Sequence, residues 1–234
     1  MTERIKSGNE ALDRVLGGGF PRNSINVLMG LPGTGKTILA EQVVFANATP
    51  ESPALYISTL SEPLDKMLRY LQGFDYFDPS LLDDDAVVYA DLGDSLRKDG
   101  LRGFVDRATE LIKEHAPSIV VIDSFKALHL FSEDGRDARH RLSELLSTLS
   151  SLATTSFLVG EYSSEEVSAF SEFAVADGIV ELVLQKHGVR DARYLRVVKQ
   201  RGSDFFGGEH AFRITLAGLE LFPRLTTPPG HISY

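Results

Sequence analysis

The chain has 234 residues, with 24 basic and 33 acidic side chains, a formal net charge of −9 and 43% hydrophobic residues. A chain of this length buries a core without disulfides or metal staples, and the absence of cysteine excludes a disulfide scaffold, a cysteine nucleophile, an iron–sulfur cluster and a zinc finger. The acidic balance disfavours non-specific binding to nucleic acid or anionic lipid.

The apolar runs are short, and the longest, residues 119–122 and 179–184, are far below the ~20 residues of a spanning helix. The first residues, MTERIK, lack the apolar core of a signal peptide. We therefore expect a soluble cytoplasmic protein with no membrane partner.

Short apolar runs alternate with longer amphipathic stretches, which is typical of an α/β domain with a mostly parallel sheet flanked by helices. Several of the runs are apolar on both faces, as in strands covered by helices on both sides. The predicted strands are residues 24–29, 54–58, 86–90, 118–122, 156–159 and 179–185. The predicted helices are residues 37–48, 64–71, 101–115, 138–153 and 165–174.

The pattern changes after residue 179, where strand-like runs follow one another directly. Residues 187–191 carry a glycine and predict a hairpin turn into a strand at 193–200. Further runs at 211–215 and 219–222 predict an antiparallel extension of the same sheet. We expect one domain, residues 1–225, and a flexible tail, residues 226–234, where prolines and glycine cannot extend a strand.

The most specific motif is GLPGTGKT at residues 30–37, which lies between a predicted strand and a predicted helix. Its glycines let successive backbone N–H groups point at phosphates, and the start of the helix adds a positive dipole. In such a loop the lysine contacts the β- and γ-phosphates, and the threonine hydroxyl binds Mg²⁺. The predicted phosphate-binding residues are Gly30, Pro32, Gly33, Thr34, Gly35, Lys36 and Thr37.

A second motif, IVVIDS at residues 119–124, is an apolar strand that ends in a carboxylate. A parallel strand next to the first would bring Asp123 to the same edge of the sheet, where it holds Mg²⁺ through water, with Ser124 beside the nucleotide. The chain has no N-K-x-D or T-K-x-D sequence of the kind that reads guanine, so ATP is favoured over GTP.

Several motifs together resemble one domain of the KaiC-type branch of the RecA superfamily of P-loop ATPases. They are SGNEALD at residues 7–13, LGGGFP at 16–21, the loop at 30–37, IDS at 122–124 and KQRG at 199–202. The opening and the late KQRG are the parts specific to this family, and the resemblance covers residues 5–225. It implies a RecA-like fold and the cofactors ATP and Mg²⁺.

The resemblance also implies a homo-oligomer, a hexameric ring being favoured, with ATP held between neighbouring subunits. Lys199 and Arg201 match the pair that reaches the γ-phosphate of the adjacent subunit. Independently, two cations two residues apart on a predicted strand project from one face. Such a pair suits a trans arginine finger that stabilises charge on the transferring phosphoryl group.

One departure from the family concerns the catalytic base. The clock protein of the family has two adjacent glutamates after the strand that follows its first helix, and these positions hold Leu60 and Ser61 here. Glu62 lies one place later and is a candidate base, although Ser61 and Glu62 also make a good helix start. Glu161, which ends a later strand, is a candidate polar sensor of the phosphates.

Three functions remain open from the sequence. The first is an ATP-binding, slowly hydrolysing oligomeric regulator that signals through assembly or through a protein partner. The second is a switch that holds ATP without significant turnover, because the glutamate pair is missing. The third is a RecA-type DNA recombination or repair ATPase, which Arg136, Arg139 and Arg141 favour and the acidic loop at residues 163–168 opposes.

Overall fold

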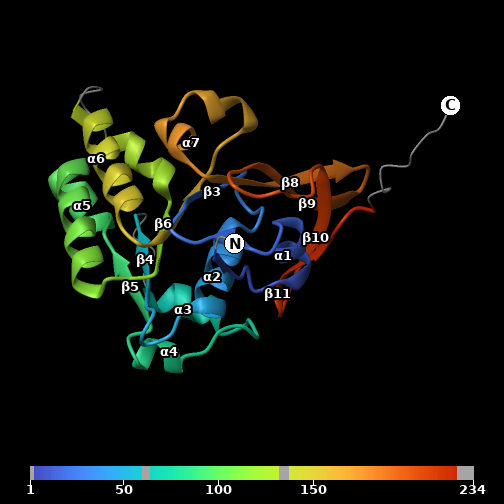
Figure 1. Ribbon diagram of the computed structural model, residues 1–234, viewed down its shortest axis with the longest axis horizontal. Helices are drawn as coiled ribbons and strands as arrows, with labels where there is room; N and C mark the ends of the chain where they lie inside the picture. Colours follow the sequence, from blue (N-terminus) through green and yellow to red (C-terminus); the bar gives the residue numbers. More distant parts are fainter. Residues whose placement is uncertain (1–2, 60–63, 132–136, 226–234) are drawn as a thin grey trace.

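A central sheet organises the computed structural model, which describes residues 3–59, 64–131 and 137–225 (Figure 1). Over these residues, nine strands form one sheet in the order β11-β10-β9-β8-β3-β7-β6-β4-β5. The strands from β8 to β5 in this order run parallel, and β9, β10 and β11 are each antiparallel to their neighbours. Their bounds are β3 (Ile25–Met29), β4 (Ala54–Ser58), β5 (Val87–Asp91), β6 (Ile119–Asp123), β7 (Thr155–Gly160), β8 (Gly178–His187), β9 (Arg190–Gln200), β10 (Glu209–Thr215) and β11 (Gly218–Phe222).

This topology confirms the predicted fold class, a mostly parallel sheet with an antiparallel extension. The nine strands expected from the sequence are all present, with ends shifted by a few residues. The hairpin expected at residues 187–191 is the β8–β9 connection, in which His187 pairs with Arg190. The extension lies at the right of Figure 1, on the far side of β3 from helices α5 and α6.

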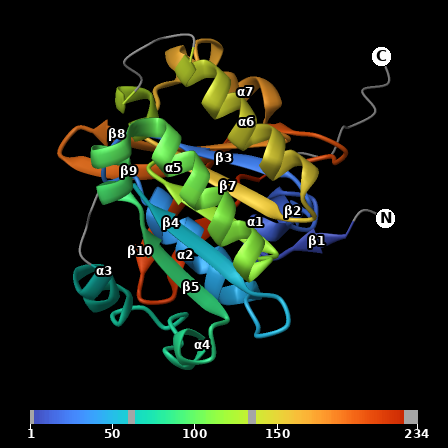
Figure 2. The ribbon, with the colours of Figure 1, turned by 90° about the vertical axis from the view of Figure 1, so that its left-hand side faces the viewer.

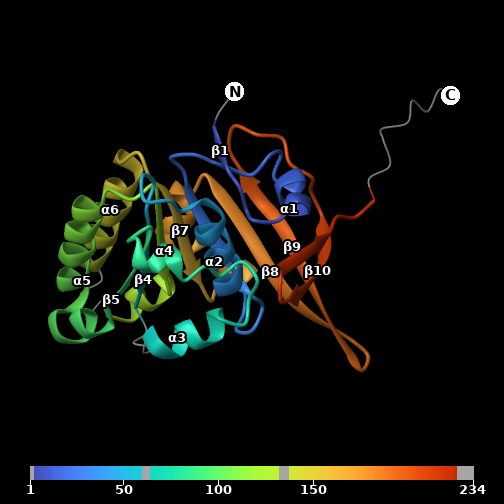
Figure 3. The same cartoon turned by 90° about the horizontal axis from the view of Figure 1, so that it is seen from below.

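Helices cover both faces of the parallel strands (Figures 2 and 3). The core on one face includes Leu39 and Val43 of α2, and the core on the other includes Phe104 of α5 and Leu145 of α6. The inner strands β3, β4, β6 and β7 are therefore buried on both sides, as their apolar composition requires. The helices are α1 (Glu10–Val15), α2 (Lys36–Asn47), α3 (Leu64–Leu71), α4 (Ser80–Asp83), α5 (Gly93–His115), α6 (Asp137–Ser151) and α7 (Ser171–Val175), with 3-10 helices η1 (Phe125–Phe131) and η2 (Ser164–Ser168).

Two helices differ from their predictions. The single helix expected at residues 165–174 is wrong, because two short helices, η2 and α7, occupy this stretch. A capping box between Ser163 and Glu166 starts η2, and the extended backbone of Phe170 separates it from α7. The helix expected at 101–115 begins earlier, at Gly93, and is kinked at Gly100, whose φ of 65° is outside the helical region.

The glycine-rich opening segment packs onto α2 and the antiparallel extension. It forms α1 and a two-stranded sheet of β1 (Arg4–Ile5) and β2 (Phe20–Pro21), none of which the hydrophobic periodicity predicted. Asn9 caps α1 by accepting from the Leu12 N–H at 2.9 Å, and Asp13 accepts from the Ser7 N–H at 2.8 Å. Gln42 of α2 donates to the Gly8 carbonyl and accepts from the Leu219 N–H. These polar contacts fix α2 between the opening segment and β11.

The predicted tail, residues 226–234, lies outside the described residues. In the part of the chain that the structure describes, no helix combines the length and apolarity needed to cross a membrane.

Candidate nucleotide site

The phosphate loop, residues 30–37, connects β3 to α2 at the carboxyl edge of the parallel strands. Gly30 has φ 146°, and a Cβ there would lie 2.1 Å from the Leu182 carbonyl oxygen of β8, so only glycine fits against the next strand. Gly35 is the residue before α2, with φ 102° in the left-handed region. The loop therefore delivers the N-terminus of α2 to the sheet edge, the arrangement that binds phosphate.

Lys36 is a buried cation in the first turn of α2, with 7% of its surface exposed. Within the described residues, its ammonium group makes one hydrogen bond, to the Leu31 carbonyl oxygen at 3.0 Å. Burial lowers its pKa, and the charges of Glu161 and Asp123 act in the opposite direction. A desolvated cation bonded to a neutral carbonyl suits an anionic ligand, so the loop fits the phosphates of a nucleotide.

Asp123, the last residue of β6, faces the loop. Its Oδ2 accepts hydrogen bonds from the Thr37 hydroxyl at 2.7 Å and the Tyr56 hydroxyl at 2.8 Å. Burial raises the pKa of Asp123, while the two hydroxyls and the Lys36 charge favour its ionised form. A hydroxyl and a carboxylate side by side are the oxygen ligands that Mg²⁺ prefers, so Thr37 and Asp123 fit this ion.

The backbone at Asp123 and Ser124 is fixed by Thr59, the residue that follows β4. Thr59 donates from its hydroxyl to the Ser124 carbonyl oxygen and accepts from the Ser124 N–H, both at 2.9 Å, and its own N–H donates to the Asp123 carbonyl oxygen. Ser124 is thus held through its backbone, directly after the residue that contacts the phosphate loop. Glu62, the candidate base, lies outside the described residues together with Leu60 and Ser61.

Glu161, the candidate sensor, follows β7, which lies between β3 and β6 in the sheet. Its side chain is exposed, and its negative charge acts on both Lys36 and Asp123, raising the pKa of each. It is therefore close to the phosphate loop, as its place in the sequence predicts.

Lys199 and Arg201 lie in a different region, toward the amino edge of the sheet. Lys199 of β9 pairs with Ile179 of β8, and Arg201 donates its backbone N–H to Asp177, whose own N–H bonds to Ile25 at the start of β3. Arg201 lies one residue past the end of β9, and not within the strand as predicted. Because β3 spans about 16 Å from this level to the phosphate loop, the two cations and the loop are separated within one chain.

The side chains of Lys199 and Arg201 make only long polar contacts. The Lys199 ammonium donates to the Phe173 carbonyl oxygen at 3.4 Å, and the Arg201 guanidinium lies 3.6 Å from the Asp177 carboxylate, with 60% of its side chain exposed. Burial and the Arg201 charge lower the pKa of Lys199. Lys199 thus contacts α7, and Arg201 contacts the segment that joins α7 to β8.

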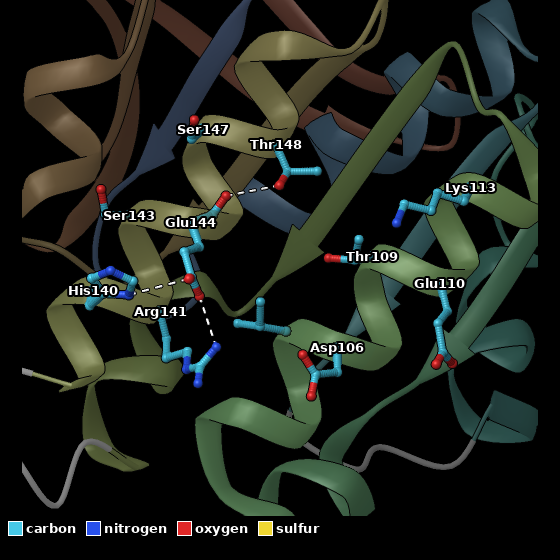
Figure 4. Close-up of a pocket in the computed structure, with 11 residues that line it drawn as sticks. Asp106, Thr109, Glu110, Lys113, His140, Arg141, Ser143, Glu144, Ser147 and Thr148 are labelled. Carbon is cyan, nitrogen blue, oxygen red and sulfur yellow. Dashed lines mark hydrogen bonds and ion pairs between the residues drawn. The ribbon is translucent and has the colours of Figure 1, made fainter.

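A separate hollow of about 840 Å³ lies between α5 and α6 (Figure 4). Three of its side chains pair with one another: Glu144 lies 3.0 Å from Arg141 and 3.3 Å from His140. It contains no residue of the phosphate loop and lies on the face of the sheet opposite α2. The candidate site is therefore the carboxyl edge of the sheet and not this hollow.

The family model described as "ATPase: KaiC" matches residues 5–226. The chain belongs to the KaiC family of ATPases. This confirms the resemblance drawn from the sequence motifs, and membership supports nucleotide binding by a RecA-like P-loop domain.

Two relatives of this KaiC-family chain differ in length. A UPF0273 protein of Aeropyrum pernix is 30% identical, with 95% of each chain covered. The circadian clock oscillator protein KaiC of a Picosynechococcus strain is 28% identical over 94% of this chain, but the match covers only 45% of the clock protein. The chain thus spans less than half of the clock protein.

The fold has a solved counterpart. A KaiC-like protein from the hyperthermophilic archaeon Pyrococcus horikoshii OT3 superposes with a TM-score of 0.81 at 24% identity, covering 95% of this chain and all of that one. This likeness confirms the RecA-like fold.

The sequence analysis missed Tyr56 of β4 and Thr59, the residue after β4, whose side chains contact the Asp123–Ser124 segment. A signal for Tyr56 was present, since it is the one tyrosine in the apolar run ALYIS at Ala54–Ser58. A buried tyrosine hydroxyl needs a hydrogen-bond partner, and the end of a neighbouring strand is where a polar one is found.

Proposed function

We propose that this chain is an ATP-binding, slowly hydrolysing oligomeric regulator, in which residues 1–225 form one ATPase domain and nucleotide lies between subunits. The observation that carries the proposal is the separation of two functional groups on one sheet. The phosphate loop follows the end of β3, whereas Arg201 is level with its beginning. A chain of this shape completes its phosphate site with cations from a neighbour, as a head-to-tail ring provides.

Within one subunit, the loop and the start of α2 bind the phosphates, and Lys36 offsets their charge. Thr37 and Asp123 would hold Mg²⁺, which supplies charge stabilisation on the phosphate oxygens when bound. Lys199 and Arg201 of the neighbour stabilise charge that develops on the γ-phosphoryl group. Because these contacts depend on the γ-phosphate, ATP and ADP bias the subunit interface differently, and this difference is the signal to an assembly or protein partner.

Slow turnover is proposed because the two positions that carry glutamates in the clock protein are Leu60 and Ser61. Glu62 is the proposed base, and Glu161 the proposed sensor that responds to the γ-phosphate. The Glu62→Gln variant should lower the steady-state rate, and Glu161→Gln should weaken the discrimination of ATP from ADP. A Glu62→Gln rate equal to that of the unchanged protein would remove Glu62 as the base.

The proposal is tested by measuring steady-state ATPase activity and oligomer mass on the same sample, with ATP and Mg²⁺ and then with ADP. We expect an oligomer with ATP and a turnover that requires it. A monomer under both conditions would contradict the shared site. An oligomer with no turnover would leave the second function, a switch that holds ATP without hydrolysing it.

A further inference from the structure

The two oxygens of the Asp123 carboxylate differ in their surroundings. Oδ2 accepts two hydroxyl hydrogen bonds, from Thr37 at 2.7 Å and Tyr56 at 2.8 Å. Oδ1 accepts no hydrogen bond from the described residues. The carboxylate is thus held by one oxygen, which leaves the other to face a ligand.

The two hydroxyl donors are not equivalent. Thr37 is in the first turn of α2, and its oxygen is the atom expected to bind Mg²⁺. Tyr56 is 1% exposed and sits in the middle of β4, which is paired with β5 on one side and β6 on the other. It lies opposite Val121, two residues before Asp123 on the same face of β6, so its long side chain reaches diagonally to the carboxylate. Tyr56 is therefore the donor that the sheet itself holds in place.

We propose that Tyr56 is a positioning residue that fixes the Asp123 carboxylate by Oδ2 and directs Oδ1 to the metal side of the phosphate loop. The inference rests on the proposed function, because it assigns Tyr56 a role at the Mg²⁺ site of that function. Partners that orient a metal-binding group typically change metal affinity or activity by about 10- to 100-fold when they are removed. Tyr56→Phe removes the donor and keeps the ring.

Tyr89 provides a matched control. Its ring packs against that of Tyr56, with the centroids 5.1 Å apart, from the adjacent strand β5. Its hydroxyl is also buried but has no hydrogen-bond partner among the described residues. Tyr89→Phe therefore removes a hydroxyl from the same aromatic pair without touching Asp123.

The test is equilibrium binding of a fluorescent ADP analogue to the full chain, first in EDTA and then in a titration with Mg²⁺. We expect Tyr56→Phe to raise the Mg²⁺ concentration at half-effect by about tenfold, and to leave binding in EDTA unchanged. Tyr89→Phe should follow the unchanged protein in both conditions. A Tyr56→Phe midpoint equal to that of the unchanged protein would overturn the inference, as would an equal loss of affinity in EDTA, which indicates damaged packing.

A double mutant separates action through Asp123 from any other effect. In an Asp123→Asn background, Tyr56→Phe should cause no further shift of the Mg²⁺ midpoint, because the carboxylate that Tyr56 orients is already absent. An additional tenfold shift would contradict a positioning role. If the unchanged protein binds no nucleotide in either condition, the proposed function itself fails, and that result is distinct from a failure of Tyr56 alone.

Discussion

The charged groups at the carboxyl edge of the sheet are more buried and more firmly hydrogen-bonded than those at the amino edge. At the carboxyl edge, Lys36 is buried and Asp123 is half-buried, and hydroxyls from two elements hold the carboxylate. At the amino edge, Arg201 is 60% exposed and Lys199 contacts a single backbone carbonyl at 3.4 Å. Contacts within the chain thus hold the charged groups of the carboxyl edge in place, whereas the cations of the amino edge remain available to a ligand or to a neighbouring chain. Under the proposed function, nucleotide binding and turnover therefore depend on different parts of the molecule.

The largest expected effect is on turnover at the amino edge. Arg201→Ala should lower kcat by about 10³-fold, since an arginine supplied to the γ-phosphate contributes at least this much. Affinity for ADP should stay within about twofold, because ADP lacks the γ-phosphate that we propose Arg201 to contact. Single-turnover ATPase assays and ADP titration check both results. Arg213→Ala, which removes another exposed arginine that pairs with Glu220, is the control and should leave kcat unchanged.

The next effect is on affinity at the carboxyl edge. Lys36→Ala should weaken ATP and ADP binding alike, by about 10- to 100-fold, because it removes a buried charged donor that both nucleotides use. Equilibrium titration with each nucleotide measures this. A loss confined to ATP would contradict the division of roles, since it would give Lys36 the behaviour expected of Arg201.

A third prediction concerns what shapes the phosphate loop. Gly30→Ala should destabilise the fold by about 2–3 kcal/mol, because the new Cβ would meet the Leu182 carbonyl at 2.1 Å. Gly33→Ala meets no atom within 4 Å, and should cost only the ~1 kcal/mol of its left-handed backbone. Denaturant unfolding of both variants measures the difference. Equal losses would show that the contact between β3 and β8 does not fix the loop.

The fold was predictable from the sequence further than the site was. The apolar run at residues 119–122 and the GLPGTGKT motif are local patterns, and the predictions made from them agree with β6 and with the loop between β3 and α2. Asn9 and Gln42 both bond to the backbone of Leu219, and Gln42 also bonds to Gly8, so they act between distant parts of the chain, which periodicity does not detect. The contact of Tyr56 with Asp123 depends on the register of β4 against β6, and adjacent pairing of these strands does not follow from their order in the chain.

The smallest expected effect lies on the surface beside the carboxyl edge. Glu166 accepts from Lys126 at 2.7 Å and from the Ser163 N–H, and these bonds lower its pKa below the usual 4.5. Its stabilising effect is complete above pH 4.5 and is lost as the pH falls through the lowered pKa of the folded state. Glu166→Gln should therefore cost at most about 1 kcal/mol near neutral pH, with the difference vanishing in acid. Unfolding free energies across pH, with Glu165→Gln as the charge-matched control, check this.

The central claim is that one chain supplies the phosphate loop and its neighbour supplies the cations. Its most direct test is to mix Lys36→Ala, which binds nucleotide weakly, with Arg201→Ala, which turns ATP over slowly, in equal amounts, and to measure ATPase activity after subunit exchange at an ATP concentration too low to saturate Lys36→Ala. If the site is shared, about one quarter of the interfaces pair an intact Lys36 with an intact Arg201, and activity returns in proportion. If each chain completes its own site, every site keeps one defect, and the mixture shows only the average activity of its two components.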